Sequence, residues 1–333
     1  MDFFTKVDTP AASFNIDYTS HLAFFGSCFA DNISAQFAAR KLDVFANPFG
    51  TVYNPVSTER QIKAIAEGKV FGEGDVFQDT RSDKLWHSWD AHGSLSGATR
   101  EECIAKMNEA ATRTREFLQK ADVVFITLGT AFVYFLKESD EAVANCHRQD
   151  ATLFERRMIG VEEASRALEC ITQDLHRIAA PSARNDNSKP HVVFTVSPLR
   201  HTGDGAHGNT LSKATLQLAI NEIMNNDSVE YFPSYEIVMD ELRDYRFYAD
   251  DMIHLSKAAE EYIFERMAET YCSERTRADI ARVEKFMKMA NHRIMNADSD
   301  IATEFAKKRM AQARELEIQI PGLDLGQDIQ TRH

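Results

Sequence analysis

The fold is decided by the stretch Leu22-Ala23-Phe24-Phe25-Gly26-Ser27-Cys28-Phe29-Ala30. Its four leading apolar residues predict a short buried strand, because a strand covered on both faces carries no polar alternation. Gly26 and Ser27 then predict a small-residue turn, and helical spacing follows from Ala30 to Arg40. This order of strand, turn and helix is typical of parallel α/β folds.

The same alternation of apolar runs and amphipathic stretches continues along the chain. Further strands are predicted at 43–46, 123–128, 192–196 and 229–232, and helices at 99–120, 161–178, 211–225 and 256–272. About five parallel strands with helices on both faces predict an α/β fold, a flavodoxin-like three-layer sandwich. In such folds the active site lies beyond the carboxyl ends of the strands.

The chain is predicted to form one main domain with a C-terminal addition. Residues 1–275 hold the α/β pattern, and residues 276–320 predict a helical extension packed on the same domain. We expect residues 321–333 to form a loosely ordered tail. The polar segment 181–190 predicts a surface loop.

Composition and charge exclude several classes of function. The 333 residues include 38 Lys and Arg against 51 Asp and Glu, a net charge of −13, so we expect no nucleic-acid and no membrane partner. The sequence has no apolar run of membrane-spanning length and no signal-peptide pattern, which predicts a cytoplasmic protein. The five cysteines include no CxxC pair, which argues against a disulfide scaffold or a cysteine zinc site.

Two distant segments carry the chemistry that we expect. Cys28 follows the first strand at a predicted helix start, where the positive end of the helix stabilises a thiolate, so we expect Cys28 to be more acidic than an ordinary cysteine. Asp251 and His254 precede the last helix of the sandwich at a spacing that lets the carboxylate orient the imidazole. His254 is then placed to act as a general base.

Other motifs give weaker support for a function. Gly203, Gly205 and Gly208 match GxGxxG, but six residues separate them from the preceding strand, which favours a flexible loop over a dinucleotide site. His201, Asp204 and His207 in the same loop are more simply solvated side chains than metal ligands. Trp86 and His87 lie in an aromatic loop that either lines a sugar-binding cleft or is pinned by its own buried rings. Arg200 and His201 follow a predicted strand and are expected to face the active-site pocket.

Several segments are similar to blocks of a known family. Gly26-Ser27-Cys28-Phe29-Ala30 is the motif that names the GSCFA family, a group that resembles the SGNH (GDSL-like) hydrolases. Family-like blocks span residues 14–300. They include 47–55 (Asn-Pro-Phe-Gly-Thr-Val-Tyr-Asn-Pro), 128–130 (Leu-Gly-Thr), 145–147 (Asn-Cys-His), 197–201 (Ser-Pro-Leu-Arg-His), 231–236 (Tyr-Phe-Pro-Ser-Tyr-Glu), 251–254 (Asp-Met-Ile-His) and 292–293 (His-Arg).

The resemblance implies roles for individual residues. The SGNH nucleophile is the Ser of a Gly-Asp-Ser block, and Cys28 occupies that position, with Ser27 one residue away. Gly50 matches the glycine whose N–H contributes to an oxyanion hole together with the Cys28 N–H. Gly129 matches the third-block glycine.

The asparagine that usually follows the third-block glycine is absent from this chain, because Thr130 stands there. Thr130 could donate by its hydroxyl, or Asn145 or Asn54 could supply the missing amide from a loop. Asp251 and His254 match the Asp and His of the closing block.

The resemblance therefore implies an ester hydrolase or acyltransferase that acts on a small-molecule or glycan acyl ester. Cys28 or Ser27 attacks the carbonyl, His254 moves the proton and Asp251 orients His254. No metal and no organic cofactor is needed. Two alternatives stay open: a non-catalytic SGNH-like binding protein, and a nucleotide-binding protein that uses the loop 203–208.

Overall fold

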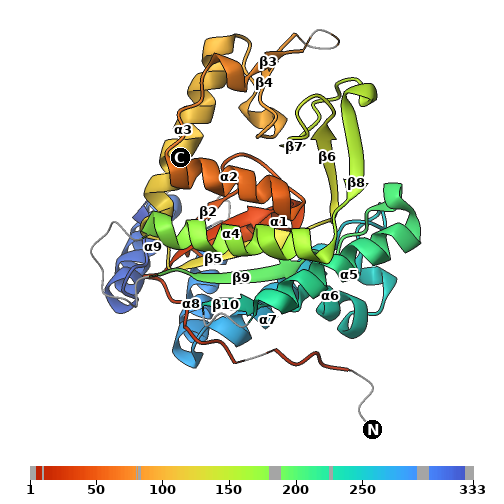
Figure 1. Ribbon diagram of the computed structural model, residues 1–333. Coiled ribbons are helices and arrows are strands. Elements are labelled where there is room, and N and C mark those ends of the chain that lie inside the picture. Colours follow the sequence, from red (N-terminus) through yellow and green to blue (C-terminus); the bar gives the residue numbers. More distant parts are fainter. Residues whose placement is uncertain are drawn as a thin grey trace.

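The structure is a computed structural model that describes residues 5–9, 11–79, 81, 84–179, 189–224, 228–290 and 300–326. Its centre is a five-stranded parallel sheet in the order β10-β9-β5-β1-β2 (Figure 1). The strands are β1 (His21–Gly26), β2 (Asp43–Ala46), β5 (Val123–Leu128), β9 (His191–Val196) and β10 (Val229–Tyr231). The expected five strands and α/β class are confirmed.

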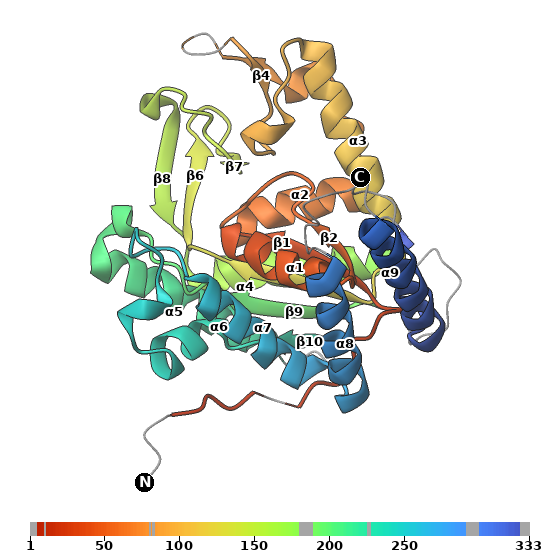
Figure 2. The same ribbon diagram turned by 180° about the vertical axis from the view of Figure 1, so that it is seen from behind.

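Helices cover both faces of the sheet, which makes a three-layer sandwich. One face carries α2 (Pro55–Glu67), α3 (Arg100–Leu118), α4 (Val161–Ala179) and α5 (Gly205–Ile223). The other carries α1 (Cys28–Ala39), α7 (Lys257–Tyr271) and α8 (Glu274–Ala290), and α1 packs against α7 on this face (Figure 2). The short helix α6 (Ser234–Glu236) contacts β9. None of the helices in the described part of the chain is long and apolar enough to cross a membrane.

The apolar runs of the strands explain this arrangement. All six residues of β5 are buried, because alternate side chains enter the two cores on opposite faces of the sheet. Phe24 stacks on Phe125 of the neighbouring strand in one core, while Phe25 belongs to the other. The continuous apolar runs thus reflect burial on both sides, as expected from the sequence.

Gly26 brings the carboxyl ends of β1 and β5 into close contact. Its φ is +131°, and a Cβ there would collide with the carbonyl oxygen of Thr127. Only glycine fits this close approach of two backbones without strain. The chain therefore leaves β1 at a fixed point and enters α1 directly at the carboxyl edge of the sheet.

A helix and two small sheets were not expected from the sequence. The helix α2 follows the Asn54 N-cap, has Pro55 at its start and ends at Gly68 in a left-handed conformation, all standard helix boundary signals. A three-stranded antiparallel sheet in the order β7-β6-β8 stands beyond the carboxyl edge of the main sheet (Figure 1). The additional strands are β6 (Phe132–Leu136), β7 (Ala142–Val143), β8 (Phe154–Met158), and a separate pair β3 (Phe77–Gln78) and β4 (Trp86–His87).

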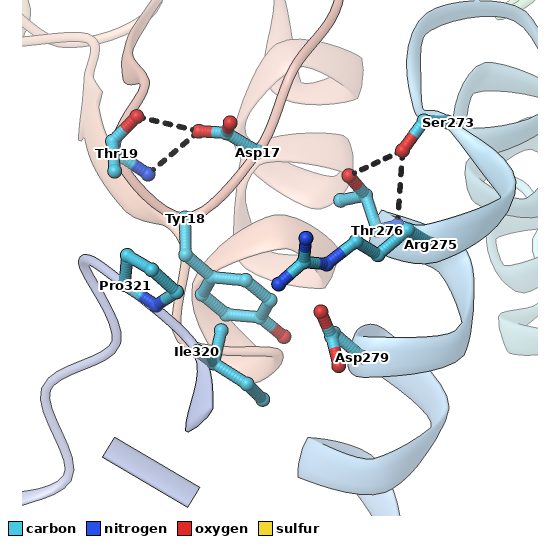
Figure 3. Close-up of a pocket in the computed structure, with 9 residues that line it drawn as sticks. All are labelled: Asp17, Tyr18, Thr19, Ser273, Arg275, Thr276, Asp279, Ile320 and Pro321. Carbon is cyan, nitrogen blue, oxygen red and sulfur yellow. Dashed lines mark hydrogen bonds between the residues drawn. The ribbon is translucent and has the colours of Figure 1, made fainter. Parts of the chain in front are cut away.

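The C-terminal part consists of α8 and α9 (Asp300–Gln319), followed by a short segment that packs on the loop before β1. Leu323 and Leu325 of this segment are buried. A pocket of about 220 Å³ lies here, with Tyr18 projecting between Pro321 and Asp279 (Figure 3). This pocket is at the amino ends of the strands, across the sheet from Cys28. The family-like pair at 292–293 and residues 181–188 of the expected surface loop lie outside the described residues.

Candidate functional site

The carboxyl edge of β1 presents Ser27 and Cys28 at the start of α1. Ser27 is the N-cap: its hydroxyl accepts a hydrogen bond from the Phe29 N–H at 3.3 Å, and the residue is only 2% exposed. Cys28 is the first helical residue and is half-buried. Its N–H lies at the helix terminus, where the helix itself supplies no acceptor.

The Cys28 thiol is less acidic than expected. Burial is the main cause of a raised pKa, and the nearby Asp31 carboxylate raises the pKa further. Hydrogen bonds from the backbone N–H groups of residues 28 and 29 and the charge of Lys213 lower it, but by less. The expectation of an acidic thiol is therefore wrong: withdrawal from water outweighs the positive end of the helix.

Lys213 is a functional candidate that the sequence analysis missed. It lies on α5, is 1% exposed, and donates hydrogen bonds to the carbonyl oxygens of Gly129 at 2.6 Å and Ser197 at 2.7 Å. Burial lowers its pKa to about 7. Its charge acts on Cys28, Arg200 and His201, so it stands at the centre of the strand ends.

A sequence signal for Lys213 did exist. Its helical face is otherwise small or apolar, with Leu216 three residues and Ile220 seven residues further along, both buried. A lysine at a core position of a helix must find hydrogen-bond partners inside the protein. The two strand-end carbonyls are those partners.

Asp251 and His254 form a pair in an exposed turn before α7. The Asp251 carboxylate contacts the His254 Nδ1 at 2.6 Å through Oδ2, and through Oδ1 it accepts hydrogen bonds from the backbone N–H groups of Ile253 and His254, each at 2.9 Å. These bonds lower the pKa of Asp251 to about 2. The His254 Nε2 forms no hydrogen bond with any residue that the structure describes. The carboxylate therefore orients the ring and leaves Nε2 open.

The two halves of the candidate site are joined through neighbouring helix starts. Asn32, one turn after Cys28 on α1, donates a hydrogen bond to Glu260 in the first turn of α7 at 2.6 Å. The charge of His254 acts on the same Glu260 carboxylate. Cys28 and His254 thus flank one contact between two helices, on the same edge of the sheet.

Gly50 occupies a tight turn at the same edge. Its N–H donates to the Asn47 carbonyl at 2.8 Å, so in this structure that N–H is not free to bind an oxyanion. Asn47 in turn donates from its side chain to Asp31 and accepts from the Gly26 N–H. A Cβ on Gly50 would collide with His92, which makes this glycine a packing requirement.

Three of the predicted residues line one pocket of about 430 Å³ beside the β6–β8 sheet: Asn54, Thr130 and Asn145. The Asn54 side chain caps α2, and the Thr130 hydroxyl contacts Ser212 at 3.1 Å. The Asn145 Oδ1 accepts from the His147 N–H, while its Nδ2 forms no hydrogen bond with the described residues. The rest of the pocket wall is largely aromatic, with Tyr53, Phe132, Tyr134 and Phe154.

The remaining predicted residues lie elsewhere. Gly129 donates its N–H to the Tyr53 carbonyl and gives its own carbonyl to Lys213. Trp86 is covered by the guanidinium of Arg100, and His87 is buried, with its ring stacked on His147 at 4.4 Å. Neither Trp86 nor His87 lines the pocket of Asn145.

The segment 201–208 is not the flexible loop that the sequence favoured, because Gly205 and Gly208 lie in the first turn of α5. Asp204 is ion-paired with Arg156, and α5 begins at Gly205, well after the end of β9 at Val196. Among the described residues, no three His, Cys, Asp or Glu side chains are grouped as metal ligands.

Comparison with known proteins gives one result. No curated protein matches the chain as a relative. A model of the GSCFA family matches residues 21–267, which is well over half of the chain and includes the strand ends, Lys213 and the Asp251–His254 pair. The protein belongs to the GSCFA family.

Proposed function

We propose that this protein is an SGNH-like ester hydrolase or acyltransferase in which Cys28 is the nucleophile, His254 the general base and Asp251 the residue that orients it. The observation that carries the proposal is the Asp251–His254 contact of 2.6 Å, which leaves Nε2 open on the sheet edge that also holds Cys28. A carboxylate, an imidazole and a nucleophile on one edge form the constellation used in acyl transfer.

The raised pKa of Cys28 favours a particular order of events. A thiol that stays protonated needs a base during the attack, so the His254 Nε2 takes the S–H proton as the sulfur bonds to the ester carbonyl. The leaving alcohol departs with that proton and leaves a thioester on Cys28. Water or a second alcohol, deprotonated by His254, then releases the acyl group and the thiol is restored.

Burial and hydrogen bonding favour Cys28 over Ser27 as the nucleophile. The Ser27 hydroxyl is buried and caps α1, while Cys28 is only partly buried. The Cys28 N–H at the helix start is our candidate oxyanion donor. Since the Gly50 N–H is bonded to Asn47, we assign Gly50 to the shape of the edge and propose no hydrogen bond from it.

The pocket of Asn145 is our candidate site for the neutral part of the substrate. Aromatic walls and an open amide donor suit a sugar ring or a similar uncharged polar group. The one cation in its wall, Arg156, is neutralised by Asp204. All five cysteines are free thiols, which supports a reaction in a reducing compartment such as the cytoplasm.

A substrate screen with nitrophenyl acyl esters and acetylated sugars tests this proposal. We expect turnover by the wild-type protein, its loss in Cys28→Ala, and its retention in Ser27→Ala. Mass spectrometry of the quenched reaction should find the acyl group on the peptide that contains Cys28. Binding of these esters without any turnover would instead favour the non-catalytic binding protein.

A further inference from the structure

A second pocket lies beside the Asp251–His254 turn and has no role in the steps above. Its volume is about 430 Å³, and it lies between the segment after β9 and the loops before α7. Arg200 forms part of its wall, Val238 and Leu242 are apolar wall residues, and Met252 belongs to the turn itself. Met252 lies between Asp251 and His254 in the sequence, so this pocket borders the turn that carries the candidate catalytic base.

Arg200 has no carboxylate partner among the residues that the structure describes. Its only hydrogen bond there runs from Nη2 to the Met239 sulfur at 3.1 Å, and sulfur is a weak acceptor. The arginines nearby are different, because Arg243 pairs with Asp240 at 2.8 Å and Arg246 with Asp244 at 3.5 Å. In a chain with a net charge of −13, a guanidinium left unpaired at a pocket wall points to an anionic ligand.

Arg243 and Asp244 also line this pocket, and each has an ion-pair partner. The rest of the wall suits an apolar group. Tyr245 and Met252 are 80% and 57% exposed, which is unusual for large side chains of this kind. Tyr248 lies beside Tyr245, with ring centroids 6.4 Å apart, and its phenol is within electrostatic reach of Arg200. Met252 has a positive φ of 59°, a left-handed conformation that is uncommon for a non-glycine residue.

We propose that this pocket binds the anionic end, a carboxylate or a phosphate, of a substrate that carries an apolar group next to that anion. Arg200 bonds the anion, and Tyr245, Tyr248 and Met252 contact the apolar part. The inference rests on the proposed function, since it places the charged end of that substrate beside His254. Lys213 interacts electrostatically with both Arg200 and Cys28, which connects this pocket to the nucleophile.

Arg200 and the residue that follows it in the chain line different pockets. His201 lines the pocket of Asn145, while Arg200 lines the pocket beside Met252. Two consecutive residues after β9 therefore line two different pockets, and only Arg200 brings a guanidinium without a carboxylate partner among the described residues. A substrate that spans both would present its ester near the strand ends between them.

Calorimetric titration of the full chain tests the inference without any need for turnover. The probes are 3-phenylpropionate, phenyl phosphate and the neutral 3-phenylpropanamide. We expect at least one anion to bind about 10-fold tighter than the amide, with binding that weakens as salt is raised. Arg200→Met should remove that preference, and Arg200→Lys should keep part of it. The charge-matched control Arg113→Met, at an exposed position on α3, should keep all of it.

Each outcome bears on the inference separately from the proposed function. Equal binding of anion and amide, or an unchanged preference in a folded Arg200→Met protein, would overturn it, as would no binding of either anion. The stronger of the two anions identifies the group as carboxylate or phosphate. Anion binding that depends on Arg200 in a protein that cleaves no ester would support the pocket and contradict the esterase.

Discussion

Two histidine–aspartate pairs lie at opposite edges of the same sheet. His21 and Asp43 pair at the amino ends of β1 and β2, and His254 and Asp251 pair beyond the carboxyl ends. Both pairs are partly exposed and both join a ring Nδ1 to a carboxylate. Contact geometry alone therefore does not distinguish a catalytic pair from a structural one.

The surroundings of the two pairs differ. His21 begins a strand, and its ring packs edge-on against Phe117 at 6.2 Å. His254 borders an arginine-lined pocket and the helix contact that leads to Cys28. The comparison teaches that the two edges of the main sheet offer different groups to a nearby histidine. The carboxyl edge brings together helix N-termini, strand-end carbonyls and a buried cation, which are groups that active sites use.

Replacement of His254 by Ala should have the largest effect and is the direct test of this comparison. If His254 is the base, kcat/KM should fall at least about 100-fold, roughly 2.7 kcal/mol of transition-state stabilisation. The melting temperature should change little, because the side chain is 48% exposed. His21→Ala is the matched control and should keep the wild-type rate. Similar rates in the His254→Ala and His21→Ala variants would mean that His254 is no more catalytic than His21.

Replacement of Lys213 by Met should lower the free energy of unfolding by about 2 kcal/mol, because it leaves two strand-end carbonyls without a donor. Urea denaturation measures this change. Lys63→Met, at an exposed position on α2, should stay within about 0.5 kcal/mol of wild type. A stable Lys213→Met protein would mean that this edge does not depend on its buried cation.

The pH dependence of stability sharpens the Lys213 test. Its pKa falls from 10.5 to about 7 on folding, so between these pH values the unfolded chain binds more protons than the folded one. Stability should therefore rise with pH across this window. The comparison of Cys28→Ala with Cys28→Ala/Lys213→Met isolates this contribution from the thiol. If the difference in unfolding free energy between these two variants does not change with pH, the pKa of Lys213 is not lowered.

Replacement of Gly50 by Ala should cost about 1–2 kcal/mol of stability, since its φ is +78° and a Cβ would displace His92. Thermal denaturation provides the measurement. Gly160→Ala is the control, because no atom lies within 4 Å of a Cβ at that position. Equal melting temperatures for the two variants would show that the turn at Gly50 adapts freely.

The smallest expected effect is the titration of Cys28. Its alkylation by iodoacetamide should reach half-maximal rate at a pH above that of a free cysteine, because burial raises the pKa. Cys146, whose pKa rises to about 11 in the neighbouring pocket, is the internal reference and should titrate higher still. Peptide-resolved mass spectrometry separates the two sites. A half-maximum for Cys28 below that of free cysteine would restore the thiolate hypothesis.

Much of the fold could be predicted from local sequence. The apolar run at 123–128 matches β5 residue for residue, and Ser256 caps α7 as expected. The small sheet β7-β6-β8 could not be predicted this way, because its strands are short and half-exposed and carry charges such as Arg156 and Arg157. Their pairing depends on partners distant in sequence, as Phe132 with Met158.

Some features of the candidate site also follow from local sequence, and others depend on distant segments. The spacing of Asp251 and His254 brings the two side chains together within one turn, so sequence alone placed that pair. The engagement of the Gly50 N–H and the burial of the Cys28 thiol depend on neighbours from other segments. Neither could be derived from the motif.

The sequence by itself determined the five strands of the main sheet, the helix start at Cys28 and the Asp251–His254 contact, because each depends on residues a few positions apart. Tertiary structure decided the direction of the Cys28 pKa shift, because burial raises the pKa by more than the helix terminus lowers it. It also placed the Lys213 ammonium against the carbonyl groups of Gly129 and Ser197, just after β5 and β9. It also left Arg200 unpaired at a pocket wall. Desolvation and charge pairing are set by segments far apart in the chain, and only folding brings those segments together.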